Sequence, residues 1–126
     1  MSTIALERAS DRSRVLSQAV AEASKRLKVN STELGAILGF SQPTSSRLLN
    51  QKYAIPEDSK EWELSAHFVR LYRSLSSLVG GDDELAKDWL TSPNRAFNQQ
   101  TPISYIKRVD GLIHACEYLD AHRAIV

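Results

Sequence analysis

This sequence of 126 residues lacks several features that mark particular classes of protein. It contains a single cysteine, Cys116, so no disulfide can form within the chain, and the apolar neighbours of this residue indicate a buried structural thiol. No apolar run approaches the roughly 20 residues that a membrane-spanning helix needs. The N-terminal segment is charged and has no apolar stretch of the kind that a secretory signal peptide requires. We therefore expect a cytoplasmic protein with no membrane partner.

Patterns typical of catalytic and metal sites are also missing. The three histidines are scattered without the spacing of metal ligands: His67, His114 and His122. Cys116 has no second cysteine with which to share a metal, and it lies two residues from His114, on a different helix face, which argues against a nucleophilic pair. The glycine pair at 80–81 follows a helical pattern rather than a strand, so it is not a phosphate-binding loop. The sequence predicts a protein that is not an enzyme and uses no cofactor or metal.

The net charge of +1 conceals an asymmetry along the chain. Residues 1–53 hold eight Lys or Arg against four Asp or Glu, whereas residues 54–126 hold eight against eleven. A basic half joined to an acidic half suggests a different partner for each, although ordinary scatter of surface charge explains the pattern equally well. The basic half is milder than a dedicated nucleic-acid binder, so a single copy should bind DNA weakly.

Helical periodicity runs through the chain and no stretch alternates as a strand does, so the sequence predicts an all-α fold. Residues with helix-capping chemistry bound most of the predicted segments, among them Gly39, Ser41 and Thr101. We predict helices over about residues 10–27, 31–38, 41–52, 57–79, 83–90 and 110–122, a short helix opening at Pro102, and a loop over 91–100.

The predicted helix over 57–79 carries an unusually wide apolar stripe. One row of apolar residues recurs at helical spacing, and other apolar side chains widen it. The row is Leu64, Phe68, Leu71, Leu75 and Leu78, and the residues beside it are Trp62, Val69, Tyr72 and Val79. A stripe of this width is buried on more than one side, as in a central helix or a dimer seam. In the last helix we expect four buried residues: Leu112, Ile113, Cys116 and Leu119.

The strongest local signal lies in residues 31–50, where two short helices flank a turn at Gly39. Gly35 precedes this glycine by four residues and allows close contact between the helices, while Gly39 suits a left-handed turn that a Cβ would penalise. This spacing is typical of a helix-turn-helix motif. Ser45 stands where a β-branched apolar residue usually packs, which predicts weaker packing than usual.

In a helix-turn-helix the second helix contacts DNA, and its polar residues face outward. The residues that we predict to contact DNA are Gln42, Thr44, Ser46, Arg47 and Asn50. Amide side chains can pair with adenine, arginine with guanine, and hydroxyls with phosphate. The alternative is a packing corner between two helices, with no role in nucleic-acid binding.

An ordered set of short motifs fills the C-terminal half. In chain order they are Trp89-Leu90, Pro93-Asn94, Phe97, Thr101-Pro102 and Gly111. This set resembles the toxin-binding domain of the Xre/MbcA/ParS antitoxin family, and the likeness extends more loosely to the Xre-like helix-turn-helix in the N-terminal half. One departure is Gln99-Gln100, where many relatives carry a glycine before Thr-Pro, so the loop could follow a different path.

The resemblance implies a partner protein and a mechanism. The partner would be a toxin of the RES type, similar in fold to ADP-ribosyl transferases, which depletes NAD. The antitoxin would cover the toxin's NAD cleft, and the pair would repress its own promoter by binding operator DNA. Pro56 marks the predicted junction between a helix-turn-helix DNA-binding unit, residues 1–55, and a helical unit for toxin binding and dimerisation, residues 56–126.

The residues of the acidic half supply a plausible surface for such a toxin. Guanidinium groups suit the carboxylates of a nucleotide cleft, and aromatic side chains anchor interfaces. The residues that we predict to contact the toxin are Asn94, Arg95, Tyr118, His122 and Arg123, with Phe97 as a further possible anchor.

Each of these predictions has a structural alternative. Trp89, Leu90 and Phe97 at this spacing more often pack in a core. Asn94 beside a proline is common in turns. Arg123 would also be favourable as a charge near the C-terminus of a helix.

A DNA-binding protein with so modest a charge needs two copies for useful avidity, so we expect a homodimer. The main rival interpretation is a stand-alone dimeric helix-turn-helix transcriptional repressor whose C-terminal half only dimerises. Such a repressor would bind its promoter without a second protein.

Overall fold

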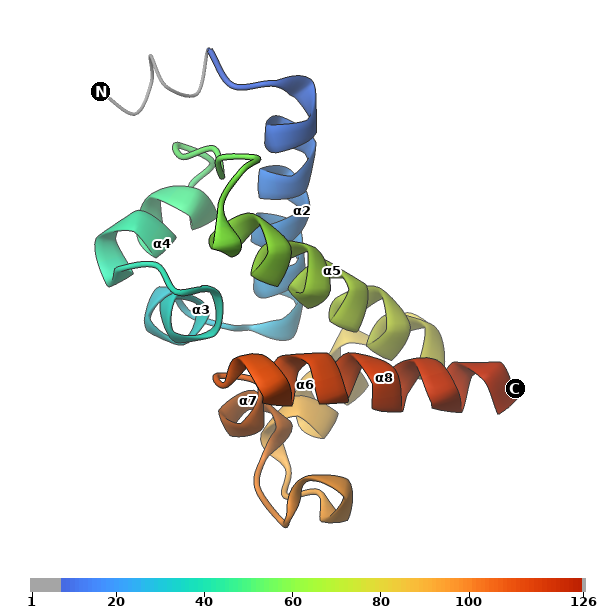
Figure 1. Cartoon of the computed structure of the whole chain (residues 1–126). Helices are drawn as coiled ribbons and strands as arrows, with labels where there is room; N and C mark the ends of the chain where they lie inside the picture. The colour runs from blue at the N-terminus through green and yellow to red at the C-terminus, as the bar shows by residue number, and fades with distance from the viewer. Residues whose placement is uncertain (1–7, 126) are drawn as a thin grey trace.

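The computed structural model describes the backbone of residues 8–125 and the side chains of residues 8–123. The first seven residues of the predicted 1–55 unit, and Val126, lie outside the described residues. Residues 8–125 contain helices and no strand, which confirms the predicted all-α fold (Figure 1). The elements are α2 (Asp11–Leu27), α3 (Ser31–Leu38), α4 (Gln42–Leu49), α5 (Lys60–Leu78), α6 (Asp83–Thr91), the 3-10 helix η1 (Arg95–Phe97), α7 (Pro102–Tyr105) and α8 (Val109–Ile125).

Local capping interactions set the beginnings of most helices. At α3, the Asn30 side chain accepts a hydrogen bond from the backbone N–H of Glu33 at 2.8 Å. The Glu33 carboxylate accepts one from the backbone N–H of Asn30 at 3.1 Å. This reciprocal pair satisfies two backbone donors that a helix leaves without partners. Ser10, Ser41 and Thr101 each cap a helix by accepting from the amide three residues on. The predicted starts of α2, α3 and α7 are therefore confirmed.

Four predictions of where helices begin, end or occur are wrong. Helix α5 begins at Lys60 rather than at residue 57 or 58, because Ser59 caps it and the Glu57 carboxylate instead pairs with Arg12 at 3.1 Å. The predicted loop over 91–100 contains η1, whose turn Asn94 caps. Helix α8 is longer than expected, since it extends to Ile125. Helix α4 is shorter than expected, since it ends at Leu49 and Gln51 has a left-handed φ of +58°. The first two differences arise from interactions that a search for periodicity does not detect.

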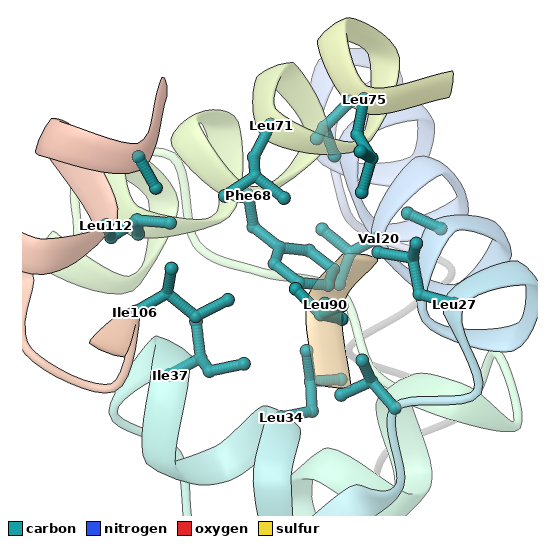
Figure 2. Close-up of a cluster of buried hydrophobic side chains, with 14 of the residues drawn as sticks. Val20, Leu27, Leu34, Ile37, Phe68, Leu71, Leu75, Leu90, Ile106 and Leu112 are labelled. Carbon is teal, nitrogen blue, oxygen red and sulfur yellow. The ribbon is translucent and has the colours of Figure 1, made fainter. Parts of the chain in front are cut away.

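Helix α5 is the centre of the molecule, as its wide apolar stripe predicted. It packs against α2, α3, α6 and α8. Phe68 of α5 is fully buried and belongs to the same core cluster as Val20 of α2 and Leu90 of α6 (Figure 2). The same core includes Leu34 of α3 and Leu112 of α8. Segments on both sides of Pro56 thus share one core, and the division at 55/56 stays a prediction.

Helix α8 turns a narrow apolar face toward this core. Leu112, Ala115, Cys116 and Leu119 recur at helical spacing and are all buried. Ile113 lies one position further round the helix and is 38% exposed, so its predicted burial is wrong. The predicted structural thiol is confirmed, because the Cys116 Sγ donates to the His67 carbonyl at 3.2 Å and burial raises its pKa to about 11. No helix in residues 8–125 is long and apolar enough to cross a membrane.

Candidate functional sites

The turn between α3 and α4 has the tight geometry that the two glycines predict. Gly39 ends α3 with φ at +84°, in the left-handed region. A Cβ added at Gly35 would lie 2.6 Å from the Phe40 carbonyl oxygen and 3.0 Å from the Ser45 Oγ. A larger residue at position 35 would therefore force the two helices apart. This close approach fixes the direction in which α4 projects from the molecule (Figure 1).

The five residues predicted to contact DNA all lie on or next to α4, on the surface. Gln42, Arg47 and Asn50 are exposed, while Thr44 and Ser46 are half-buried. Helix α4 contains no acidic residue. The structure therefore gathers an uncharged polar and basic face, which suits contact with bases and phosphates.

Hydrogen bonds order this face before any partner binds. The Gln42 amide donates to Ser31 Oγ at 2.8 Å, which ties the start of α4 to the start of α3. The Arg47 guanidinium donates to Thr44 Oγ1 at 3.1 Å. The Asn50 side-chain amide donates to the Ser46 backbone carbonyl at 3.0 Å. Ser31 is a member of this array that the sequence analysis missed, because its contact to α4 crosses the turn.

In the C-terminal half, Phe97 of η1 is the centre of an aromatic cluster. Its ring stacks on Tyr105 with centroids 4.6 Å apart, and meets the rings of Trp89 and Tyr118 edge-on at 6.0 and 5.4 Å. Phe97 is almost completely buried. Phe97 therefore belongs to the core, which was the alternative prediction for this residue, and it is not available as an interface anchor.

Two of the predicted toxin-contact residues lie together on α8. Tyr118 is half-buried and His122 is exposed, and their ring centroids are 4.2 Å apart. His122 Nδ1 also lies 2.8 Å from the Tyr118 carbonyl oxygen. The contact between Phe97 and Tyr118 packs η1 against this part of α8, so exposed Arg95 is carried by a turn that adjoins the Tyr118–His122 pair.

Asn94 shapes the loop that carries Arg95. The Asn94 side-chain oxygen accepts a hydrogen bond from the backbone N–H of Ala96 at 2.9 Å. The backbone N–H of Asn94 donates to the Gln100 carbonyl at 3.0 Å. Gln99, at the position of the departure from the family pattern, has φ of +66°. This left-handed conformation favours glycine, which explains why a glycine would be suited to this part of the loop. Asn94 thus has a structural role, and its contact with a toxin stays a prediction.

Arg123 lies in a polar network between α5 and α8. Its guanidinium donates to the buried Ser74 Oγ at 3.1 Å, and Ser74 in turn donates to the Asp120 carboxylate at 2.7 Å. Arg70 also pairs with Asp120. The hydrogen bond from Ser74, followed by the interaction with Arg70, lowers the pKa of Asp120. Arg123 is therefore directed toward α5, whereas Tyr118 contacts Phe97 of η1.

This network was not anticipated from the sequence. Asp120 and Arg123 are three residues apart on one helix, a spacing that could have suggested an ion pair. Ser74 and Arg70 lie about fifty positions earlier, and only the packing of α5 against α8 brings them to Asp120. No group of acidic, histidine or cysteine side chains in residues 8–123 has the arrangement of a metal site.

Comparison with known families gives two matches. The antitoxin Xre-like helix-turn-helix domain matches residues 7–70, which are 64 of the 126 residues. The chain belongs to the Xre-like antitoxin family. The antitoxin Xre/MbcA/ParS C-terminal toxin-binding domain matches residues 74–124 of this antitoxin. A comparison with curated proteins gives no match.

The predicted DNA surface and the predicted toxin surface lie in different matched segments. The α4 face lies in the segment that matches the helix-turn-helix domain, and all five predicted toxin-contact residues lie in the segment that matches the toxin-binding domain. The antitoxin therefore combines a DNA-binding unit with a toxin-binding unit. The matches meet within α5, the helix around which the common core is built.

Proposed function

We propose that the antitoxin neutralises an NAD-depleting toxin of the RES type by covering its active-site cleft, and that it represses its own operon by binding operator DNA. The observation that carries the proposal is the match of residues 74–124 to the toxin-binding domain of the Xre/MbcA/ParS antitoxins. The RES identity of the toxin is supported by the resemblance of the motifs between Trp89 and Gly111 to that family.

The surface proposed for the toxin is the C-terminal part of α8 with the turn at η1. Tyr118 and His122 form a compact aromatic pair, and the exposed Arg95 adds a charge on η1, whose Phe97 contacts Tyr118. Arg123 is held by Ser74, so less conformational entropy is lost when it binds an acidic group. Groups fixed in this way suit a tight interface that blocks a cleft, since little rearrangement is needed on binding.

Co-expression with the neighbouring reading frame tests this function in cells. We expect that frame to stop growth and lower cellular NAD when expressed alone, and the full-length antitoxin to restore both. Because both halves share one core, the whole chain should be used rather than a fragment. If the neighbouring frame is harmless alone while the antitoxin binds its operator, the stand-alone dimeric repressor becomes the better interpretation.

Variants of α8 test the proposed surface in the same assay. The double substitution His122→Ala and Arg123→Ala should abolish rescue of growth. Arg108→Ala is the matched control, because this exposed arginine precedes the other end of α8 and pairs only with Asp110 among the described residues. Equal rescue by both variants would contradict the placement of the toxin at the C-terminal part of α8.

A further inference from the structure

An apolar surface that the sequence analysis did not single out lies on α6 and at the end of α5. Leu85 of α6 is 51% exposed and Leu78 of α5 is 37% exposed. Trp89 is half-buried and follows Leu85 by four residues, so the two side chains share a face of α6. We call Leu78, Leu85 and Trp89 the α6 patch. Single exposed apolar residues are common, whereas several in one region mark a surface that another molecule covers.

The packing of α5 against α8 places the first part of this patch beside the C-terminal part of α8. Arg123 of α8 donates to Ser74 Oγ at 3.1 Å, and Leu78 lies one helical turn after Ser74 on the same face of α5. The glycine turn at residues 80–81 then starts α6 at this end of the molecule (Figure 1). Leu78 and Leu85 therefore lie at the end of the molecule that carries Arg123.

Aromatic contacts connect the other part of the patch to α8. The Trp89 ring meets the Phe97 ring edge-on with centroids 6.0 Å apart, and Phe97 meets Tyr118 at 5.4 Å. Tyr118 in turn lies 4.2 Å from the His122 ring. The α6 patch consequently adjoins the surface that we propose for the toxin.

We propose that the α6 patch binds an apolar side chain of the toxin outside its NAD cleft and supplies affinity, while the C-terminal part of α8 blocks the cleft. The inference rests on the proposed function and divides its surface into two parts with different effects. Burial of apolar area drives most association between proteins, and Leu78 and Leu85 offer such area. His122 and Arg123 are exposed and polar, which suits a substrate cleft rather than an apolar anchor.

Two observations favour the toxin over DNA as the partner of the α6 patch. All three of its residues lie in residues 74–124, the segment that matches the toxin-binding domain. DNA requires a surplus of basic charge. Helix α6 with its cap, residues 82–91, instead holds four acidic residues and one lysine.

The proposal is tested by measuring binding and inhibition separately with the purified product of the neighbouring reading frame. We expect Leu85→Asp in the full-length antitoxin to raise the Kd for this toxin at least about tenfold, because a charge would be buried against an apolar side chain. At saturating concentration the variant should still stop NAD consumption completely. The double substitution His122→Ala and Arg123→Ala should have the opposite effect, since it remains bound but leaves NAD consumption running.

Val109→Asp is the matched control for Leu85→Asp. Val109 is 55% exposed and begins α8 at the end away from His122, so the same new charge there should leave the Kd for the toxin unchanged. Leu85→Met keeps an apolar side chain and should bind as the natural sequence does. Circular dichroism and operator binding should be unchanged in every variant, which verifies that the fold is retained.

Four results would overturn the proposal. The first is an unchanged toxin affinity for both Leu78→Asp and Leu85→Asp, and if these variants alter only the sedimentation of the free antitoxin, a second copy covers the patch. The second is a Leu85→Asp variant that fails to inhibit even when bound, which would place the patch in the block itself. The third is loss of binding by the variant with His122→Ala and Arg123→Ala. The fourth is the absence of any complex with the natural antitoxin, which would also overturn the proposed function. The first three leave the proposed function standing, so the two failures are distinguishable.

Discussion

Ser45 places a buried hydroxyl at the contact between α3 and α4. Its Oγ has no hydrogen-bond partner among the described residues. A buried hydroxyl without a partner costs about 1–3 kcal/mol. We expect Ser45→Ala to raise the free energy of unfolding by about 1 kcal/mol, because alanine removes that cost and favours the helix. Denaturant unfolding measures the change.

Operator binding supplies the control for this variant. Ser45 is buried, so its replacement should leave the exposed face of α4 and the affinity for DNA unchanged. A decrease in stability would mean that the hydroxyl does make a favourable interaction in solution.

Asp120 links α8 to α5 through a carboxylate whose pKa is lowered in the folded chain. A group with a lowered folded pKa stabilises the fold above its unfolded pKa, about 3.9 for aspartate, and this contribution is lost as the pH falls through the folded pKa. Asp120→Asn should therefore be less stable than the natural sequence at neutral pH. The difference should shrink as the pH falls below about 4.

Urea unfolding of both proteins across this pH range checks the prediction. Asp88→Asn is a suitable control, because Asp88 is exposed and its carboxylate makes no ion pair or hydrogen bond within residues 8–123. A stability difference for Asp120→Asn that does not change with pH would show that the carboxylate charge is not the stabilising feature.

Among the single elements, α4 carries most of the residues predicted to contact DNA. Arg47 is exposed on this helix and its guanidinium is held by Thr44. We expect Arg47→Ala to weaken binding to the operator roughly tenfold or more, since a pair between arginine and guanine contributes about 1–3 kcal/mol of discrimination. Stability should change little, because the side chain packs against few others.

The control for Arg47→Ala is Lys107→Ala, which removes the same charge from an exposed position between α7 and α8. Operator binding by fluorescence anisotropy at constant salt compares the two. An equal loss for both variants would indicate general electrostatic attraction, and no loss for Arg47→Ala would favour the packing-corner interpretation of α3 and α4.

The elements differ in how far their sequences predict them. Helices α2 and α3 follow from local features, since their caps and apolar positions lie within one or two turns. The start of α5 does not, because Glu57 is used in a contact with α2. A three-residue turn such as η1 is too short to show a period. The candidate DNA surface could be predicted because its residues lie within nine positions of one another, on or next to one helix.

The toxin surface was harder to predict, because its arrangement depends on packing between distant segments. The sequence predicted toxin contacts for Tyr118 and His122, which are four residues apart and share a helix face, and these contacts stay predictions. It gave no indication that Arg123 is tied to Ser74, since these residues are 49 positions apart. The burial of Phe97 followed from its aromatic character, but the ring partners that make it central come from three other helices.

The whole molecule behaves as one packed unit rather than as two units joined by a linker. Phe68 and its neighbours on α5 contribute to a core shared by the DNA-binding and toxin-binding segments. Two exposed ion pairs, Arg26–Asp83 and Lys28–Glu84, each at 3.3 Å, also link α2 to α6. Exposed pairs of this kind contribute little, so the core holds the two segments together. The DNA and toxin surfaces consequently keep a fixed orientation to each other.

The proposed blocking of a toxin's NAD cleft by the C-terminal part of α8 can be measured as NAD consumption by the purified toxin. Titration with the full-length antitoxin should stop NAD consumption at stoichiometric amounts. The variant with His122→Ala and Arg123→Ala should not inhibit, whereas Arg108→Ala should inhibit fully. If the toxin binds the natural antitoxin and still consumes NAD at the same rate, the antitoxin does not cover the toxin's NAD cleft.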